Sequence, residues 1–314
     1  MEFSWIKNKF GIERKPIKIG LALSGGAALG LSHIGCLKAF EEADIKPAVI
    51  SGTSAGAIIG GMYCSGMSIE EIEEIALSID RMKTFNLFTP TIKRGALIKD
   101  DNILNFFREH LGDTKIEDLD IPFVAVSVDI ESGETVYMNK GSLIGAIRAS
   151  ISIPGIFPPF ISNNRLLVDG GLRSNLPLEV LNSYDLDRIV GVNVLKNSQL
   201  KMKSCYDTID LQNLPTEENE HNILEKINKV VRGDKKNQFQ FPPLMKSLFN
   251  SLQILLAESS QREIEIVQPD LVINIDVSDF QLWEFWEARK LINIGYKTTK
   301  EILQKSESIK ILYR

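Results

Sequence analysis

The order of apolar and polar positions predicts strands that alternate with helices over the first part of the chain. Apolar runs at 17–23 and 48–53 have the length and the flanking glycines of buried strands, and residues 31–42 between them are predicted to form a helix. Two strands joined through such a helix pair in parallel, because the crossover returns the chain to the same end of the sheet. The pattern therefore predicts a βαβ unit within the first sixty residues.

The pattern continues through the middle of the chain. Residues 150–160 contain three prolines within six positions, which excludes a helix and predicts an apolar loop suited to the wall of an apolar pocket. Residues 160–168 predict a hairpin that turns at Asn163-Asn164 and delivers Asp169 to the end of a strand. The other predicted elements are helices at 68–76, 100–110, 142–149 and 177–182 and strands at 122–128, 134–138 and 189–194.

The composition changes at about residue 196. Residues 196–243 are rich in charged side chains, and only 223–231 within them shows apolar residues at helical spacing. This polar insertion could be a lid, a contact to a second copy of the chain or a flap that faces a membrane, and the sequence does not favour one of these. After it, helices are expected at 244–263 and 281–304 and strands at 271–275 and 309–313. We expect one α/β domain over 17–314, three-layered, with a mainly parallel central sheet flanked by helices.

Residues 1–16 form a separate basic amphipathic arm. Five apolar residues in it are interleaved with lysine and arginine, a composition that can lie on an anionic membrane surface. We favour the simpler interpretation that the arm docks on its own domain or on a second copy in a homodimer. It lacks a long apolar core followed by a small-residue cleavage site, so it is not expected to be a secretory signal.

Composition and charge narrow the functional classes. The chain has 314 residues, 44% hydrophobic content and a net charge of -5, which allow a large core and argue against nucleic acid as a partner. Its three cysteines, Cys36, Cys64 and Cys205, have no metal-binding spacing and are interpreted as reduced thiols of a cytoplasmic protein. The longest uncharged run, 47–69, is interrupted by Gly, Ser, Thr and Pro, which favours a buried strand and helix over a membrane span.

The candidate nucleophile is Ser54. It lies in Gly52-Thr53-Ser54-Ala55-Gly56, between the second predicted strand and an apolar run typical of a helix. A serine at such a strand-to-helix turn needs neighbours with almost no side chain, because strand and helix approach closely there. The N-terminus of the following helix also favours negative charge near the serine. The pattern is typical of a nucleophile elbow, although a glycine-rich turn can produce it by chance.

A glycine-rich loop before the elbow is a candidate oxyanion site. The loop, 24–30, follows the first strand and leads into a helix, so its backbone N–H groups can point toward the elbow of the neighbouring strand. The alternative is a dinucleotide-binding loop, but the glycine spacing differs, and Val49 and Ile50 stand where an acidic ribose ligand is required. The sequence therefore favours an acyl-transfer site.

The base is harder to assign, because the chain has only three histidines. His33 precedes the serine and is interpreted as a core histidine under the glycine loop, His110 ends a helix, and His221 lies in the polar insertion. Asp169, in Asp169-Gly170-Gly171, remains: a partly desolvated carboxylate that touches the serine hydroxyl can act as the base. The alternative is that Asp169 belongs only to a turn.

The ordered motifs resemble those of the patatin-like phospholipases, of the bacterial type related to the neuropathy target esterase group. The resemblance rests on four stretches: Gly25-Gly26-Ala27-Ala28-Leu29-Gly30 with the helix start after it, Gly52 to Gly56, Ala149 to Pro154 with Phe157-Pro158-Pro159, and Asp169-Gly170-Gly171 followed by Asn175 and Pro177. It covers residues 17–195 firmly and the last seventy residues loosely. The family pattern has a third glycine and an Arg or Lys where this chain has Ala27 and Leu29.

The resemblance implies a serine esterase of the phospholipase A type with a Ser-Asp catalytic dyad. In this interpretation Ser54 attacks an ester of a phospholipid or lysophospholipid, Asp169 serves as the base, and backbone donors at Gly25, Gly26 and Ala27 hold the oxyanion. No metal and no cofactor are implied, and the expected location is the cytoplasm, with peripheral contact to membrane lipids. The rival hypothesis is a non-catalytic, membrane-associated lipid-binding regulator with the same fold.

Overall fold

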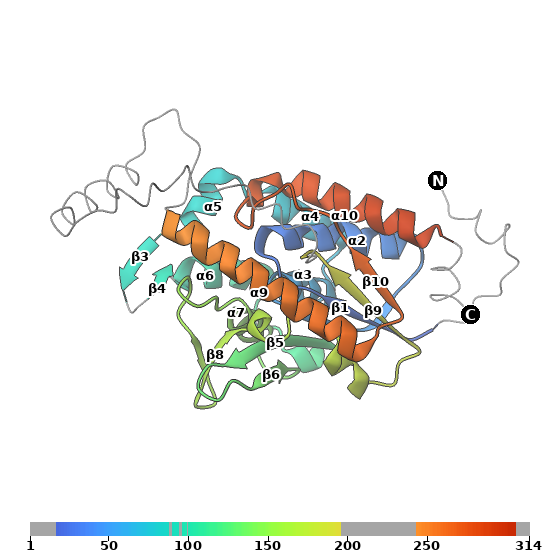
Figure 1. The fold of residues 1–314 in the computed structure, drawn as a ribbon, viewed down its shortest axis with the longest axis horizontal. Helices are drawn as coiled ribbons and strands as arrows, with labels where there is room; N and C mark the ends of the chain where they lie inside the picture. Colours follow the sequence, from blue (N-terminus) through green and yellow to red (C-terminus); the bar gives the residue numbers. More distant parts are fainter. Residues whose placement is uncertain (1–16, 88–89, 94–95, 99, 196–242, 306–314) are drawn as a thin grey trace, which may run out of the picture.

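The computed structural model describes residues 17–87, 90–93, 96–98, 100–195 and 243–305 (Figure 1). The basic arm (1–16), nearly all of the polar insertion with its expected helix, and the strand expected at 309–313 lie outside these ranges. The predictions for those segments therefore remain predictions.

The apolar runs of the sequence form one eight-stranded sheet with the order β10-β9-β1-β2-β5-β8-β7, to which β6 is added beside β5. The first five of these strands are parallel, and β6, β7 and β8 are antiparallel to their neighbours. The expected α/β class is confirmed, and the sheet is mixed because the hairpin closes one end. The strands are β1 (Ile19–Leu23), β2 (Pro47–Thr53), β5 (Phe123–Asp129), β6 (Thr135–Met138), β7 (Phe160–Ser162), β8 (Arg165–Asp169), β9 (Arg188–Asn193) and β10 (Leu271–Asn274).

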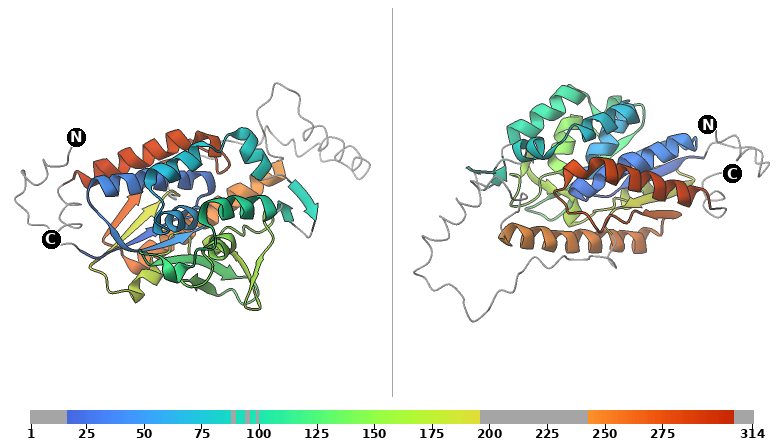
Figure 2. Two further views of the ribbon diagram at one scale, coloured as in Figure 1. Left: turned by 180° about the vertical axis from the view of Figure 1, so that it is seen from behind. Right: turned by 90° about the horizontal axis from the view of Figure 1, so that it is seen from above.

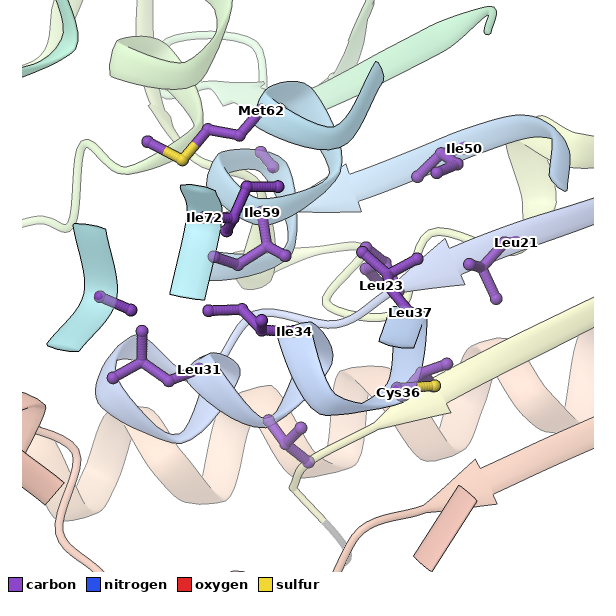
Figure 3. Packing of buried hydrophobic residues seen from close by; sticks show 14 of the residues in the cluster. Leu21, Leu23, Leu31, Ile34, Cys36, Leu37, Ile50, Ile59, Met62 and Ile72 are labelled. Carbon is purple, nitrogen blue, oxygen red and sulfur yellow. The ribbon is translucent and has the colours of Figure 1, made fainter. Parts of the chain in front are cut away.

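Alternate residues of the strands face two layers of helices. Leu21, Leu23 and Ile50 lie in the larger core with the helices α2 and α3 (Figure 3), whereas Ala22 and Val49 lie in a smaller cluster on the other face. Because side chains alternate across a strand, both faces need cover. Figure 2 shows α9 on the opposite side of the strands from α2 and α10. The helices are α2 (Ser32–Glu42), α3 (Ala55–Cys64), α4 (Ile69–Leu77), α6 (Asp100–Leu111), α7 (Leu143–Ser150), α9 (Pro243–Val267) and α10 (Ala288–Leu303).

Local sequence signals set several of these boundaries. Ser68 caps α4 and forms a capping box with Glu71, and the side chain of Ser142 caps α7. The hairpin between β7 and β8 turns at Asn163 and Asn164, both with positive φ (49° and 59°), as predicted.

Two predicted helices differ from the structure. The helix expected at 281–304 begins only at Ala288, after a short 3-10 turn η8 (Phe285–Glu287). The stretch before it is held as a loop, because the carbonyl of Leu282 accepts a hydrogen bond from Ala28 N at 2.9 Å. The helix expected at 177–182 is the 3-10 helix η4 (Glu179–Ser183).

Three further elements between α4 and α6 were not predicted from the sequence. They are a short helix, α5 (Arg81–Leu87), and a two-stranded antiparallel sheet of β3 (Pro90–Lys93) and β4 (Ala96–Ile98).

Candidate active site

Ser54 stands alone between β2 and α3 in a backbone conformation that few side-chain-bearing residues adopt. Its φ is 52° and its ψ is -116°, and its side chain is nearly buried. A Cβ at Gly52 would lie 2.4 Å from the carbonyl oxygen of Gly56, and one at Gly56 would lie 2.1 Å from the carbonyl oxygen of Leu23. Both glycines are therefore required by the close approach of strand and helix, as the elbow interpretation predicted.

The register of β5 brings the ends of β2 and β8 together. Thr53, at the end of β2, pairs with Val126, and Asp169, at the end of β8, pairs with the next residue, Ser127. β6 pairs with both of these β5 residues along one edge of β5, so β2 and β8 both lie along the other edge. β2 is parallel and β8 antiparallel to β5, so their C-terminal ends meet there. Ser54 and Asp169 consequently face each other, although 114 positions separate them in the chain.

The Asp169 carboxyl is poised between two donors. It accepts a hydrogen bond from the Ser54 hydroxyl and another, at 2.8 Å, from the N–H of Gly171. Gly171 is the second residue of the 3-10 turn η3 (Gly170–Leu172). The side chain is 5% exposed. Burial raises the pKa of Asp169 and the two hydrogen bonds lower it; burial is the larger effect, so the pKa rises from 3.8 to about 6. A carboxylate with a pKa near 6 is ionised at neutral pH and is a stronger base than an exposed aspartate.

The glycine-rich loop offers two backbone donors rather than three. The N–H of Gly25 donates to the carbonyl of Asn175 at 3.0 Å, so the expected oxyanion role does not fit this amide. For the amides of Gly26 and Ala27, no hydrogen bond to another described residue is found, and both residues line the cavity beside Ser54. The geometry thus favours Gly26 and Ala27 as donors, with Gly25 as a support of the loop.

The two departures from the family pattern have different structural consequences. Ala27 has a φ of 47°, a left-handed conformation that glycine adopts more easily than alanine, and it lines the cavity beside Ser54. Leu29 is 1% exposed and packs in the larger hydrophobic core. The Leu29 side chain therefore supports the loop from inside and does not line the cavity over Ser54.

The two described histidines do not line the cavity. His33 is fully buried under the loop, where its Nε2–H donates to the carbonyl of Ser24 at 2.8 Å, and burial lowers its pKa to about 4. His110 lies at the end of α6 with Nδ1 bonded to the carbonyl of Phe106 at 2.8 Å. The interpretation of His33 as a core histidine is confirmed, and His221 lies outside the described residues.

Ser150 contacts the nucleophile directly, a role that was not predicted although the residue lies in the motif from Ala149 to Pro154. Its Oγ accepts the backbone N–H of Ser54 at 2.9 Å and donates to the carbonyl of Val126 at 2.6 Å. The hydroxyl is completely buried between α7 and β5. Ser150 therefore ties the strained elbow to the strand that also aligns Asp169.

Replacing Ser150 with alanine is expected to lower kcat about tenfold or more with little change in KM. The substitution leaves the Ser54 N–H and the Val126 carbonyl buried without a partner, at a cost of about 1–3 kcal/mol each in the free energy of unfolding. Ester hydrolysis and thermal unfolding would be measured together. Ser150→Thr, which keeps the hydroxyl, should recover part of the activity, and a variant with alanine that retains full kcat would contradict this role.

The cavity over Ser54 is small and mostly apolar. It has a volume of about 10 Å³, roughly the room for one water molecule. Ile153, from the predicted apolar loop, forms one wall. The remaining apolar wall was not predicted, because it comes from distant parts of the chain: Leu252, Leu256 and Leu282.

In the described ranges, no three His, Cys, Asp or Glu side chains gather closely enough to hold a metal ion. Of the described helices, none combines the length and the apolar composition that crossing a bilayer requires. Cys36 and Cys64 are both buried in the core, and Cys205 lies outside the described residues.

The sequence is similar to a known family of proteins. A model of the family described as patatin-like phospholipase matches residues 21–182, about half of the 314-residue chain. The uncharacterized NTE family protein Rv1063c of Mycobacterium tuberculosis is 34% identical over 177 residues, covering 56% of this chain and 49% of that protein. The neuropathy target esterase sws of Drosophila melanogaster is 33% identical over 181 residues, covering 56% of this chain and 13% of that protein.

The matched region is only a part of each relative. The chain spans about half the length of the mycobacterial proteins it matches. Among solved structures, VipD from Legionella pneumophila is similar with a TM-score of 0.46 and 14% identity, covering 91% of this chain and 66% of that chain.

Proposed function

Because the chain belongs to the patatin-like phospholipase family, we propose that it hydrolyses carboxylic ester bonds of phospholipids or lysophospholipids with Ser54 as the nucleophile and Asp169 as the base. The observation that carries this proposal is the hydrogen bond from the Ser54 hydroxyl to a buried carboxylate whose pKa is raised to about 6. A turn aspartate without a catalytic role has no need to be buried against a strained serine.

The first half of the reaction follows from this contact. Ser54 Oγ attacks the ester carbonyl while its proton passes to Asp169, and the N–H groups of Gly26 and Ala27 stabilise the oxyanion that forms. The tetrahedral intermediate then collapses, and Asp169 returns the proton to the departing alcohol. The products of this half are an acyl ester on Ser54 and the released alcohol, which is a lysophospholipid when the substrate is a phospholipid and a glycerophosphodiester when it is a lysophospholipid.

The second half uses the same groups in reverse. Asp169, again ionised, takes a proton from a water molecule, and the resulting nucleophile attacks the acyl ester. Collapse of the second intermediate returns the proton to Ser54 Oγ and releases a free fatty acid. One carboxylate thus serves both halves, and no histidine takes part.

The surroundings of the dyad support an apolar acyl group as the part of the substrate that is bound. Ile153, Leu252, Leu256 and Leu282 line the cavity, and Asp169 is its only charged lining residue among those described. An apolar wall favours a fatty acyl chain over a polar one. We further propose that the lipid is taken from a membrane surface by a peripherally bound protein.

A fluorophosphonate probe separates this proposal from the rival, a lipid-binding regulator of the same fold, which the small cavity over Ser54 favours. An activated serine attacks the phosphorus and forms a stable covalent adduct. We expect stoichiometric labelling of the wild-type protein, located at Ser54 by peptide mass spectrometry, and none of Ser54→Ala. A folded wild-type protein that stays unlabelled would support the regulator.

A further inference from the structure

The described part of α9 carries its side chains in two distinct directions. Leu252 and Leu256 point to the cavity over Ser54, one helical turn apart, and the next turns of the same stripe carry polar residues that face the protein. Ile254 and Leu255, between the two cavity residues, are 43% and 57% exposed. The helix therefore offers two inward and two outward aliphatic positions within five residues.

Polar contacts fix the second half of α9 to the segment that follows Asp169. The carboxylate of Glu263 accepts the N–H groups of Leu178 and Glu179 at 3.0 and 3.1 Å. The hydroxyls of two serines in the preceding turn bind Asn175: Ser259 accepts its backbone N–H at 3.0 Å, and Ser260 accepts its side-chain N–H at 2.9 Å. These four contacts, two of them fully buried, hold the helix in one position relative to the dyad.

Leu256 also contacts the turn that carries Asp169. A Cβ at Gly171 would lie 2.2 Å from Cδ2 of Leu256, so this leucine packs directly on the glycine whose N–H binds the Asp169 carboxylate. With Leu256 and Leu252 in these positions, the cavity of about 10 Å³ has no room for an acyl chain. The two side chains occupy space that a chain attached to Ser54 requires.

We propose that Leu252 and Leu256 determine which acyl groups are transferred to Ser54. This inference rests on the proposed ester hydrolysis. An acetyl group needs little more than the existing cavity, whereas an octanoyl chain must displace both leucine side chains, because the polar contacts of α9 keep the helix backbone in place. The preference for acyl-chain length is thus set on α9, outside the residues that the family model matches.

The experiment compares p-nitrophenyl acetate, butyrate and octanoate as substrates, each below its aggregation limit. For Leu252→Ala and Leu256→Ala, we expect the octanoate-to-acetate ratio of kcat/KM to rise at least about tenfold over wild type, because one methylene in an apolar pocket is worth about 10-fold or more. Leu256→Phe should lower the ratio. Ile254→Ala and Leu255→Ala, on the exposed side of the same helix, are matched controls and should leave the ratio unchanged.

An unchanged ratio in both inward variants, or an equal shift in the outward controls, would overturn the inference. If Leu256→Ala does not fold, as judged by thermal unfolding, the half-buried Leu252 provides the same comparison at lower structural cost. A wild-type protein that hydrolyses none of the esters and resists fluorophosphonate would contradict the proposed function itself, whereas hydrolysis without a change of ratio contradicts only the role of α9.

Discussion

Substituting alanine for Ser54 is expected to lower kcat for p-nitrophenyl butyrate by about 10⁴-fold or more, with the protein still folded. The loss is large because the acyl-enzyme cannot form, and the donors at Gly26 and Ala27 alone give only a small part of the acceleration. Alanine fits the space of Ser54, which is 7% exposed, and has a similar preference against its φ of 52°, so the midpoint of thermal unfolding should shift by only a few degrees. Initial rates and circular dichroism would be measured on the same preparation.

The matched control is Ser78→Ala, at an exposed serine that ends α4. This substitution also removes one serine hydroxyl, but Ser78 does not line the cavity, so the variant should keep the wild-type kcat. Turnover by Ser54→Ala at more than a few per cent of the wild-type rate would refute the assignment of the nucleophile.

Replacing Asp169 with asparagine is expected to abolish hydrolysis to a similar degree while it stabilises the fold. Asparagine keeps an acceptor for the Ser54 hydroxyl and the Gly171 N–H but cannot take up a proton, so kcat should fall by roughly 10³-fold or more. In the wild-type protein, kcat/KM should rise with pH through about 6, where Asp169 loses its proton. A pH profile that is flat between 5 and 8 would contradict Asp169 as the base.

The effect on stability has a definite sign. Burial raises the pKa of Asp169 from 3.8 to about 6, so between these values the folded state binds more protons than the unfolded state. The free energy of unfolding of the wild-type protein therefore falls as pH rises from about 4 to about 6, by as much as about 3 kcal/mol from this group, and it stays lowered above pH 6. Asp169→Asn lacks this loss, so urea unfolding at pH 7.5 should show it to be more stable than wild type. An equal or lower stability of the variant at that pH would argue against a buried charge.

The sequence predicts the sheet well because its signals are local. The runs at 17–23 and 189–194 are mostly apolar, and each forms a strand as predicted. The first of them also pairs in parallel with β2, as the βαβ pattern predicted. The hairpin was predicted from Asn163 and Asn164, which tolerate positive φ. Helix ends were predicted where a capping residue such as Ser68 is present, and were misplaced at 281–287, where a tertiary hydrogen bond to Leu282 replaces a local signal.

The parts of the site that the sequence did not predict depend on contacts between distant residues. No feature of Gly25 indicates that its N–H is taken by Asn175, since both the loop and the segment that contacts it must fold first. Leu252 and Leu256 follow the spacing of apolar residues found in any amphipathic helix, so the sequence does not single them out. They reach Ser54 only because of the direction in which α9 crosses the sheet (Figure 1). The polar contacts of Ser260 and Glu263 could have been suspected from their position on the apolar stripe of that helix.

The direction in which the Asp169 side chain points depends on the number of residues in β8. Asp169 faces Ser54 because β8 begins at Arg165 and pairs Asp169 with Ser127, and side chains in a strand alternate between the two faces of the sheet. Loss of one residue from β8 would turn the position now held by Asp169 to the opposite face, whereas loss of two would restore its direction. Length changes within the part of β8 that pairs with β5 are therefore subject to an odd-even rule, whereas a change at the hairpin tip leaves the pairing of Asp169 with Ser127 in place.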